Sequence, residues 1–489
     1  MRKYAVALTF LLVASGCGGS SDTATPATTV ATAASQAPIS TAPAETSTAP
    51  TTTAITVATT GAPTTTVVTS TIAPTTTATT PTTTVTPPAT TAALTSASST
   101  NSLQPSAEPG SFRAEVQSAF QTVVDEEFAI AQQKAGISVA VYTDDVLWTY
   151  ALGEASSIAD MTVNTSIPIG STSKTFVAAL ILTQIHQGLY EVTDSLEQVL
   201  SDHPDYGSFD KSKINPDVTV GQMLSMRSGL PNFNDNRDGI RGLFQSTTWK
   251  PADNVNLVQD AFVEPGGFDY NDTNLVLLGL IAELQGGQSL NDLYKTAFFD
   301  PLKVSAVLPP HDVLPSNTAY PYGNLAPYDE GFGNIIDAAP YDLGHYWRGQ
   351  SKMRWPCCGL ISTPENLARW GHNLYSTNGS ALSGSARQRL QESLLSEPVM
   401  YQGVVQNYGY MTTQRTYEFS GDRRIATVGH PGGGGGYSTL MRYAPELDLT
   451  VVILANSLLS ESGTCATDES HRDIRNCLAA RIFLAYAQQ

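Results

Sequence analysis

Hydrophobic and polar residues follow regular patterns only in the part of the chain after residue 111. Apolar positions three and four apart over residues 112–128 predict an amphipathic helix. Two β-type runs follow, 136–142 (GISVAVY) and 146–152 (VLWTYAL), and the short polar link between them predicts a hairpin.

Three more strand-like runs stand near the C-terminus and precede a last amphipathic helix. They are 424–430 (RIATVGH), 437–443 (YSTLMRY) and 449–456 (LTVVILAN). The chain between the two sets of strands reads as mostly helix and loop. We therefore predict an α+β fold for residues 112–489, in which an antiparallel sheet formed by N- and C-terminal strands is flanked by helices and carries an inserted, mainly helical lobe.

Residues 18–111 show none of these patterns and consist mainly of Thr, Ala, Pro, Ser and Val. Such a composition buries too little apolar surface to offset the entropy of ordering, so we predict a disordered stalk.

Residues 1–17 contain two basic residues, at positions 2 and 3, followed by an apolar stretch that is too short to span a membrane, which predicts a signal peptide. The segment that ends at Cys17 resembles the lipobox of bacterial lipoproteins, although Ala14 replaces the usual Leu. This predicts lipidation of Cys17 and an extracytoplasmic, membrane-tethered protein; the alternative is an ordinary signal peptide.

The net charge of −18 argues against nucleic acid as a partner and against electrostatic docking on anionic lipid.

In an oxidising compartment Cys465 and Cys477 are expected to form a disulfide. For the adjacent Cys357 and Cys358, we favour two buried thiols over a strained vicinal disulfide. The cysteines and the seven histidines show no metal-ligand spacing, so we predict neither a metal nor a cofactor.

A serine and a lysine three residues apart, Ser171 and Lys174, open a strongly apolar helix at residues 175–186. Residues at this spacing share one helical face, and the free N–H groups at a helix start favour developing negative charge. Burial of Lys174 is expected to lower its pKa, so that it accepts the serine proton. The alternative is a helix-capping serine with an exposed lysine. A second Ser-x-x-Lys, at residues 208–211, is not followed by an apolar helix and is set aside.

Several blocks extend this motif, and together they resemble the serine β-lactamase and penicillin-binding protein family, in its class C and low-molecular-weight D-Ala-D-Ala carboxypeptidase branch. The blocks are 169–200, 218–233 (VTVGQMLSMRSGLPNF), 264–283 (EPGGFDYNDTNLVLLGLIAE), 358–370 (CGLISTPENLARW) and 428–457. The resemblance implies that Ser171 is the nucleophile, that Lys174 is its base, and that no cofactor takes part.

The family's second motif, Tyr-x-Asn, matches Tyr270-Asn271-Asp272, with Asp in the last place. A strict Tyr-x-Asn at residues 322–324 lies in a Pro-rich loop, whereas Tyr270 precedes the expected apolar helix, so we choose Tyr270. The resemblance implies that Tyr270 shares the proton relay and that Asp272 contacts the substrate.

The third motif is Lys-Thr-Gly in most β-lactamases and reads His430-Pro431-Gly432 here; residues 186–188 (HQG) lie at a helix end and are rejected. His430 and Gly432 are expected to border the substrate, since a glycine on a strand lets a substrate backbone approach. The resemblance assigns the oxyanion hole to the amides of Ser171 and Gly433. The glycine run 432–436 suggests an open strand start.

Asp217, directly before the second block, and Arg227 and Asn274, within matching blocks, are assigned to structure. We predict a serine hydrolase of the D-alanyl-D-alanine carboxypeptidase type, acting through an acyl-enzyme on a peptidoglycan stem peptide. The alternatives are an esterase or D-aminopeptidase of the same fold that acts on a small ester or amide, and a non-catalytic cell-wall-binding module.

Overall fold

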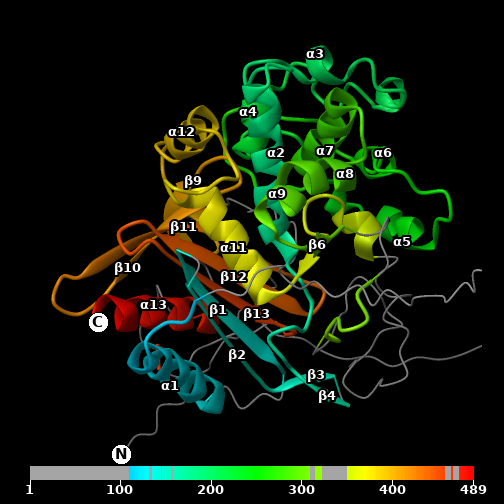
Figure 1. Cartoon of the computed structure of the whole chain (residues 1–489). Helices are drawn as coiled ribbons and strands as arrows, with labels where there is room; N and C mark the ends of the chain where they lie inside the picture. Colours follow the sequence, from blue (N-terminus) through cyan, green and yellow to red (C-terminus); the bar gives the residue numbers. More distant parts are fainter. Residues whose placement is uncertain are drawn as a thin grey trace, which may run out of the picture. The chain divides into compact units, whose positions relative to one another are not determined.

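The first and last strands of the folded chain lie next to each other in one eight-stranded sheet, in the order β2-β1-β13-β12-β11-β10-β9-β8 (Figure 1). Every neighbouring pair is antiparallel, and β1 pairs with β13 from Ile137 opposite Ala455 to Tyr142 opposite Thr450. The predicted closure of the sheet by both ends of the chain is therefore confirmed. The strands are β1 Ile137–Thr143, β2 Val146–Leu152, β8 Val399–Tyr401, β9 Val404–Tyr408, β10 Thr413–Glu418, β11 Arg424–Gly434, β12 Tyr437–Ala444 and β13 Leu449–Ala455.

This computed structural model describes one compact unit, made of residues 110–130, 135–144, 146–156, 158–308, 314–321, 350–457, 464–465 and 473–489. The predicted signal peptide, Cys17 and nearly all of the predicted stalk lie outside the described residues, as does the rejected motif at 322–324. Within the described ranges, no helix combines the length and the apolar character that crossing a membrane requires.

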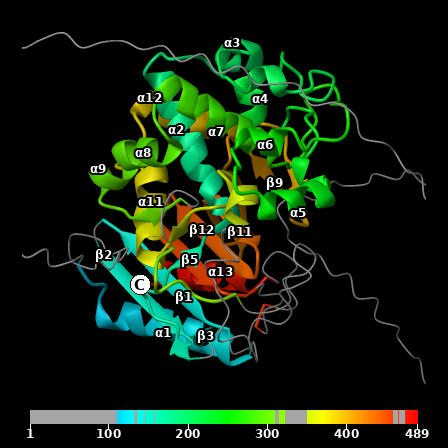
Figure 2. The ribbon, with the colours of Figure 1, turned by 90° about the vertical axis from the view of Figure 1, so that its right-hand side faces the viewer.

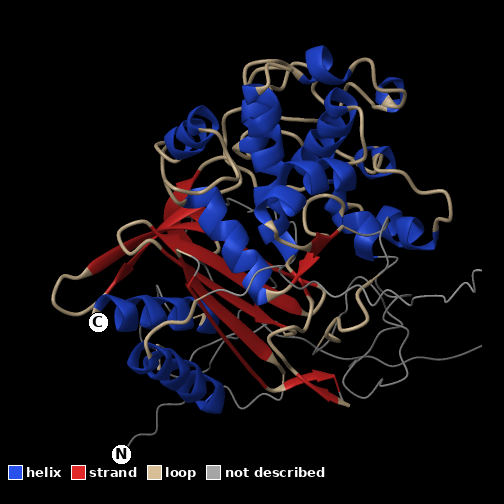
Figure 3. Cartoon of the chain, viewed as in Figure 1, coloured by secondary structure: helices blue, strands red, loops and turns tan. Residues whose placement is uncertain are grey.

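Helices cover both faces of the sheet, because side chains along each strand alternate between the faces. On β1, Val139 and Val141 belong to the core beneath α1 (Ala114–Ile130) and α13 (Ile474–Ala487). Ala140 and Tyr142 belong to the core on the other side, under α11 (Pro364–Tyr375). Figure 3 shows the two layers of helices with the sheet between them.

The inserted lobe is built around two helices that are apolar on nearly all sides, α2 (Lys174–His186) and α7 (Thr273–Gly286), which pack against each other (Figure 2). A helix without a polar face is buried all round. The shorter helices of the lobe and of the chain after it are α3 Leu196–Leu200, α4 Val220–Leu224, α5 Arg237–Gln245, α6 Ala252–Val255, α8 Leu290–Tyr294, α9 Asp300–Leu302 and α12 Gly384–Ser393. Five short strands form two small sheets, β3 Glu154–Ser156 with β4 Ala159–Asp160, and β5 Ile167–Pro168 with β7 Ile361–Ser362 and β6 Ala306–Val307.

Two features differ from the sequence prediction. Strands β8 to β10 were not predicted, because their short runs mix polar and apolar residues and form strands by pairing outward from β11. The glycine run does not open a strand: β11 continues through Gly434, and Gly432 and Gly433 pair with Thr439 and Ser438 of β12.

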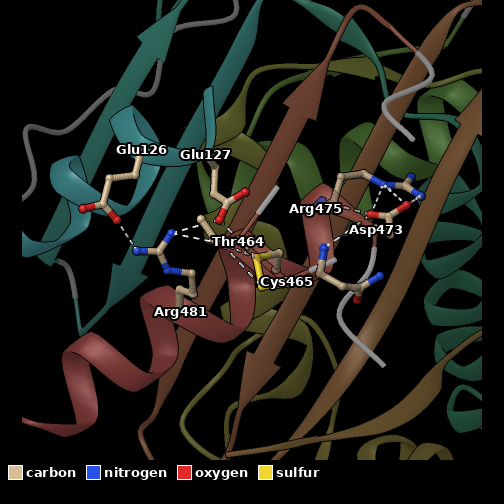
Figure 4. The surroundings of a disulfide bond; sticks show 9 residues. Glu126, Glu127, Thr464, Cys465, Asp473, Arg475 and Arg481 are labelled. Atoms are coloured by element: carbon tan, nitrogen blue, oxygen red, sulfur yellow. Dashed lines mark hydrogen bonds and ion pairs between the residues drawn. A yellow bond between two sulfur atoms is a disulfide. The ribbon is translucent and has the colours of Figure 1, made fainter. Parts of the chain in front are cut away.

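Cys465 and Cys477 form the predicted disulfide at the start of α13 (Figure 4). Nearby, Arg481 binds the carboxylates of Glu126 and Glu127 on α1, with 2.9 Å between its Nη1 and Glu127 Oε1. These contacts fix the C-terminal helix to the first helix of the fold.

The lobe and the sheet are joined by a stacked pair of buried rings, Phe176 on α2 and Trp370 on α11. Their centroids lie 3.9 Å apart with an interplanar angle of 9°, and the indole Nε1 donates to Thr175 Oγ1 at 3.0 Å.

Trp370→Ala is expected to lower the free energy of unfolding by about 3–5 kcal/mol, because it leaves a cavity between the two helices. Urea unfolding measures this change. Leu395→Ala, at a side chain that is 83% exposed, is the control and should change it by less than about 0.5 kcal/mol; equal losses in both variants would contradict the prediction.

Candidate active site

Ser171 lies in a tight 3₁₀ turn, Gly170–Ser173, that runs directly into α2. Gly170 begins this turn with a φ of +54°, a conformation that glycine adopts without strain. A β-carbon at Gly170 would lie 2.6 Å from the amide nitrogen of Gly433, so only glycine lets the turn approach β11 this closely. The two amides that the resemblance assigns to an oxyanion hole, those of Ser171 and Gly433, belong to these two packed segments.

Ser171 and Lys174 are brought together as their spacing predicts. Lys174 Nζ lies 3.2 Å from Ser171 Oγ, and the serine is 6% exposed while the lysine is fully buried. This is hydrogen-bonding distance between an amine and a hydroxyl. The exposed capping arrangement that was the alternative is therefore not what the structure contains.

Asp272 forms a buried ion pair with Lys174, with 2.7 Å between its Oδ1 and the lysine Nζ. Its other oxygen accepts a hydrogen bond from Asn234 Nδ2 at 2.8 Å, and neither charged side chain is exposed. Asp272 also precedes the first residue of α7, where the helix dipole favours a negative charge. Both oxygens of Asp272 thus face protein groups. The expected contact of Asp272 with substrate stays a prediction.

The pKa of Lys174 moves in the opposite direction from the one the sequence suggested. Burial is the largest single effect and lowers this pKa, but the Asp272 carboxylate and the smaller effects of Cys358, Tyr270 and Cys357 together outweigh burial, so the pKa lies well above its ordinary value. In the resting protein Lys174 is therefore an ammonium, and it must lose a proton before it can act as a base.

Tyr270 lies beside this ion pair, with the centroid of its ring 5.0 Å from Lys174 Nζ. Tyr401 and Tyr408, from the unpredicted strands β8 and β9, pack against it at centroid distances of 5.0 and 6.0 Å. Its hydroxyl is buried and has no hydrogen-bond partner within the described part of the chain. Burial raises the pKa of Tyr270 well above its ordinary value, and the lysine charge opposes this only in part. The phenol thus stays protonated and is suited to donate a proton.

His430 is fully buried on β11. Its Nδ1 lies 2.6 Å from the carbonyl oxygen of Pro431, and its Nε2 lies 3.0 Å from the Tyr408 hydroxyl. Because a carbonyl only accepts, a neutral ring donates through Nδ1 and accepts the Tyr408 proton at Nε2. The ring of His430 therefore contacts Tyr408, and the expected substrate contact of His430 stays a prediction.

Gly432 is required by the close approach of the nucleophile's turn. A β-carbon there would lie 2.1 Å from the carbonyl oxygen of Ile169 and 2.9 Å from Thr172 Oγ1. Thr172 Oγ1 in turn donates to the carbonyl oxygen of His430 at 3.2 Å. The Gly432 carbonyl accepts from the buried Arg475 at 2.9 Å, so the start of α13 also supports this strand.

Cys357 and Cys358 are buried thiols that form no disulfide, which is the state that the sequence favoured. Cys358 Sγ lies 3.5 Å from Ser171 Oγ and 3.3 Å from Lys174 Nζ, and the Cys357 carbonyl lies 3.4 Å from the same nitrogen. Sequence reasoning missed this contact. Cys358 opens one of the matching blocks, but nothing in the block indicates which way its side chain points.

The same two thiols and Asp272 offer three potential metal-ligating atoms within 4.8 Å of one another, a grouping that sequence spacing does not show. Two of the three residues already contact the Lys174 ammonium through these atoms. The Lys174 ammonium is therefore the cation that these groups contact in this structure.

The residues assigned to structure form hydrogen bonds or polar contacts within the protein. Arg227 donates to the carbonyl oxygens of Ser225 and Tyr408, at 3.0 and 3.3 Å, and Asn274 Nδ2 contacts Met226 Sδ at 3.4 Å. The Asp217 amide donates to Asn215 Oδ1 at 3.0 Å. In the rejected motif, Lys211 lies over the ring of Tyr206.

Comparison with known proteins places this site in a family. The sequence profile of the β-lactamase family, described as "Beta-lactamase", matches residues 116–475. Penicillin-binding protein 4 of Amycolatopsis lactamdurans is 23% identical over 344 residues, which are 67% of this chain and 82% of that protein. Unguisins hydrolase ungD of Aspergillus violaceofuscus is also 23% identical, over 68% of this chain, and the match spans 60% of its length.

Among solved structures, the D-amino acid amidase of Ochrobactrum anthropi SV3 superposes with a TM-score of 0.60 at 20% identity, over 77% of this chain and 99% of that one. An octameric penicillin-binding protein homologue from Pyrococcus abyssi superposes with a TM-score of 0.53 at 22% identity, over 70% of this chain and 73% of that one. The chain therefore belongs to the β-lactamase family, and its fold is that of this family's serine hydrolases.

Asp272→Asn tests whether the carboxylate sets the protonation state of Lys174. Removing the negative charge lowers the pKa of Lys174, so the rate at which Ser171 acylates should reach its plateau at a lower pH than in the wild type. The rate of Ser171 labelling by a fluorophosphonate, measured across pH, reports this shift. A variant that reacts more slowly at every pH with an unshifted profile would contradict it.

The same variant should be less stable at neutral pH. A lysine whose folded pKa exceeds its unfolded value contributes stability below the unfolded pKa, and this contribution is lost as pH rises through the folded pKa. Breaking a buried pair costs about 3–5 kcal/mol. Asp238→Asn is the matched control, because Asp238 pairs with Arg241 at the surface and should change neither stability nor profile measurably.

Proposed function

We propose that this protein hydrolyses amide bonds of D-amino-acid-containing peptides through an acyl-enzyme on Ser171, as a carboxypeptidase of the D-alanyl-D-alanine type. The observation that carries the proposal is the 3.2 Å approach of Ser171 Oγ to a fully buried Lys174 whose charge is balanced by Asp272. A hydroxyl with an adjacent amine, placed at the start of a helix, is the arrangement of an activated serine nucleophile.

The ion pair sets the order of proton transfers. Lys174 first passes a proton to Asp272, 2.7 Å away, which leaves a neutral amine beside a neutral acid. The amine then takes the proton of Ser171 as Oγ attacks the substrate carbonyl, and backbone amides stabilise the oxyanion. Tyr270, whose pKa is raised by burial, donates the proton that the leaving amine requires. Water then attacks the ester and gives a proton to the Tyr270 phenolate. Lys174 returns a proton to Ser171 Oγ as the acid leaves, and Asp272 returns its proton to Lys174.

The named relatives support D-configured substrates. One is a penicillin-binding protein 4, and two of the similar folds are called a D-amino acid amidase and a D-stereospecific amidohydrolase. A stem peptide that ends in D-Ala-D-Ala combines a D-configured residue with a scissile amide, and it is our first choice of substrate.

One observation favours a second candidate, an amidase, aminopeptidase or esterase of the same fold. Where most β-lactamases carry Lys, this chain carries His430, which is fully buried and hydrogen-bonded within the protein. It therefore offers no exposed cation for the terminal carboxylate of a carboxypeptidase substrate. A D-amino acid amide or a small ester has no such carboxylate.

A non-catalytic cell-wall-binding module would retain the fold without using the ion pair. It predicts binding of a penicillin or a stem peptide without turnover of any amide or ester. The buried ammonium beside Ser171 argues for catalysis. Burying a charge lowers the stability of the fold, and a module that only binds has no use for such a charge beside a serine.

We also propose that the protein is a lipoprotein held outside the cytoplasm through Cys17, on the basis of the lipobox-like segment. Cys17→Ser should abolish incorporation of a labelled fatty acid and release the protein from the membrane fraction in a bacterial host. A variant that still fractionates with the membrane and still carries label would rule out Cys17 as the anchor.

Ser171→Ala tests the nucleophile. Intact mass after incubation with a penicillin should show a covalent adduct on the wild type and none on the variant, and hydrolysis by the variant should fall by roughly 10⁴-fold or more. Hydrolysis that persists at the wild-type rate in the variant would overturn the proposal.

Three substrates then separate the candidates. Release of D-alanine from a diacylated Lys-D-Ala-D-Ala peptide supports the carboxypeptidase, turnover of D-alanine amide supports the amidase, and turnover of p-nitrophenyl acetate alone supports the esterase. The L-configured peptide and amide are the matched controls. A penicillin adduct with no turnover of any of the three would favour the binding module.

A further inference from the structure

The two adjacent cysteines stand out because the mechanism proposed above does not use them. Their sulfur atoms lie 2.8 Å apart, and both residues are buried and reduced. Elsewhere the same chain holds a formed disulfide, Cys465–Cys477. A chain that forms one disulfide meets oxidising conditions, and under these conditions two neighbouring thiols need a reason to stay reduced.

These thiols touch the reactive groups directly. Cys358 Sγ lies within hydrogen-bonding distance, for sulfur, of both Ser171 Oγ at 3.5 Å and Lys174 Nζ at 3.3 Å. The peptide between the two cysteines also takes part, because the Cys357 carbonyl oxygen lies 3.4 Å from Lys174 Nζ. Two of the groups around the lysine therefore belong to one dipeptide.

The dipeptide is anchored on both sides, and the chain just after it is hydrogen-bonded to the region of the nucleophile's turn. The Cys358 amide donates to the carbonyl oxygen of Arg354 at 2.8 Å. Just after it, the Leu360 amide donates to Ser173 Oγ at 3.2 Å, and the Leu360 carbonyl accepts from the Ile169 amide at 2.9 Å. A change in the conformation of this dipeptide is therefore transmitted to the turn that carries Ser171.

We propose that Cys357 and Cys358 form a redox modification site, in which a peroxide converts the dithiol into a vicinal disulfide and thereby lowers the reactivity of Ser171. The effect on Ser171 rests on the proposed function, whereas the disulfide itself does not. The Lys174 ammonium beside Cys358 supplies the positive surroundings that are typical of reactive cysteines.

The chemistry balances with hydrogen peroxide as the oxidant. Cys358 sulfur attacks the O–O bond and becomes a sulfenic acid, while the other oxygen leaves as water. Cys357 sulfur then attacks the oxidised sulfur, an S–S bond forms, the S–O bond breaks, and a second water leaves. Two thiols lose two electrons and one peroxide is reduced to two waters. A small dithiol reverses the reaction by thiol–disulfide exchange.

Reversibility follows from the spacing of the two residues. Disulfide-linked residues usually have Cα atoms about 4.4–6.8 Å apart, whereas adjacent residues are held at about 3.8 Å. The resulting bond is strained, and strained disulfides are the labile, regulatory ones. Oxidation removes the Cys358 proton and reorients the peptide that carries the Cys357 carbonyl, so Ser171 and Lys174 lose contacts together.

The experiment uses the full chain, hydrogen peroxide as the probe, and a fluorophosphonate to measure the reactivity of Ser171. After brief oxidation, peptide mapping should find residues 357 and 358 linked, with the loss of two hydrogen atoms. The labelling rate should fall by roughly tenfold and return after treatment with dithiothreitol. Each variant is compared with its own untreated sample.

Cys357→Ala and Cys358→Ala cannot form the bond and should keep most of their untreated labelling rate after the same treatment. A Cys465→Ala/Cys477→Ala variant controls for reduction of the other disulfide and should respond to peroxide like the wild type. Equal, reversible loss in Cys357→Ala, or a linked dipeptide with an unchanged labelling rate, would overturn the proposal.

The two proposals fail in different ways. If Ser171 in the reduced wild type is not labelled at all, the proposed function fails, and with it the regulatory effect, while peptide mapping still decides whether the dithiol is a modification site. If Ser171 is labelled but residues 357 and 358 never link under peroxide, only the redox site fails.

Discussion

The buried ion pair between Lys174 and Asp272 is the interaction on which the active site depends. Two charges removed from water are tolerated only when they are paired and their remaining hydrogen-bonding capacity is satisfied. Asn234, the start of α7 and the dipeptide Cys357-Cys358 meet that requirement. Because Lys174 opens α2 and Asp272 precedes α7, the pair also fixes the two central helices of the lobe against each other.

The second constraint is the close backbone contact between the nucleophile's turn and strand β11. Gly170 and Gly432 leave no space for a β-carbon, so the turn rests directly on the strand that carries Gly433. Arg475, two residues before the disulfide-bonded Cys477, donates a hydrogen bond to the Gly432 carbonyl and so supports the same strand from the C-terminal helix. The turn that carries Ser171 thus rests on the sheet, and Lys174, which follows it directly, opens a central helix of the lobe.

Much of the fold could be predicted because its central elements are locally unambiguous. Strands β1, β12 and β13 are rich in apolar residues and helix α2 is strongly apolar, so each has one stable environment, a buried one. Strands β8 to β10 have no such runs, and Met400 and Val405 on them are largely exposed, so their strand character comes from pairing outward from β11. That pairing brings Tyr401 and Tyr408 to Tyr270, and local sequence contains no sign of it.

The sequence by itself determined three features. The sheet closed by the first and last strands follows from hydrophobic periodicity. The Ser171–Lys174 pair follows from spacing along one helix, and the disulfide from the short loop between its two cysteines. The tertiary structure alone decided the protonation of Lys174, the inward orientation of Asp272 and His430, and the contact of Cys358 with the nucleophile. These depend on burial and on distances between residues that are far apart in the sequence. Electrostatic interactions in a desolvated site are set by those distances, and a local motif does not encode them.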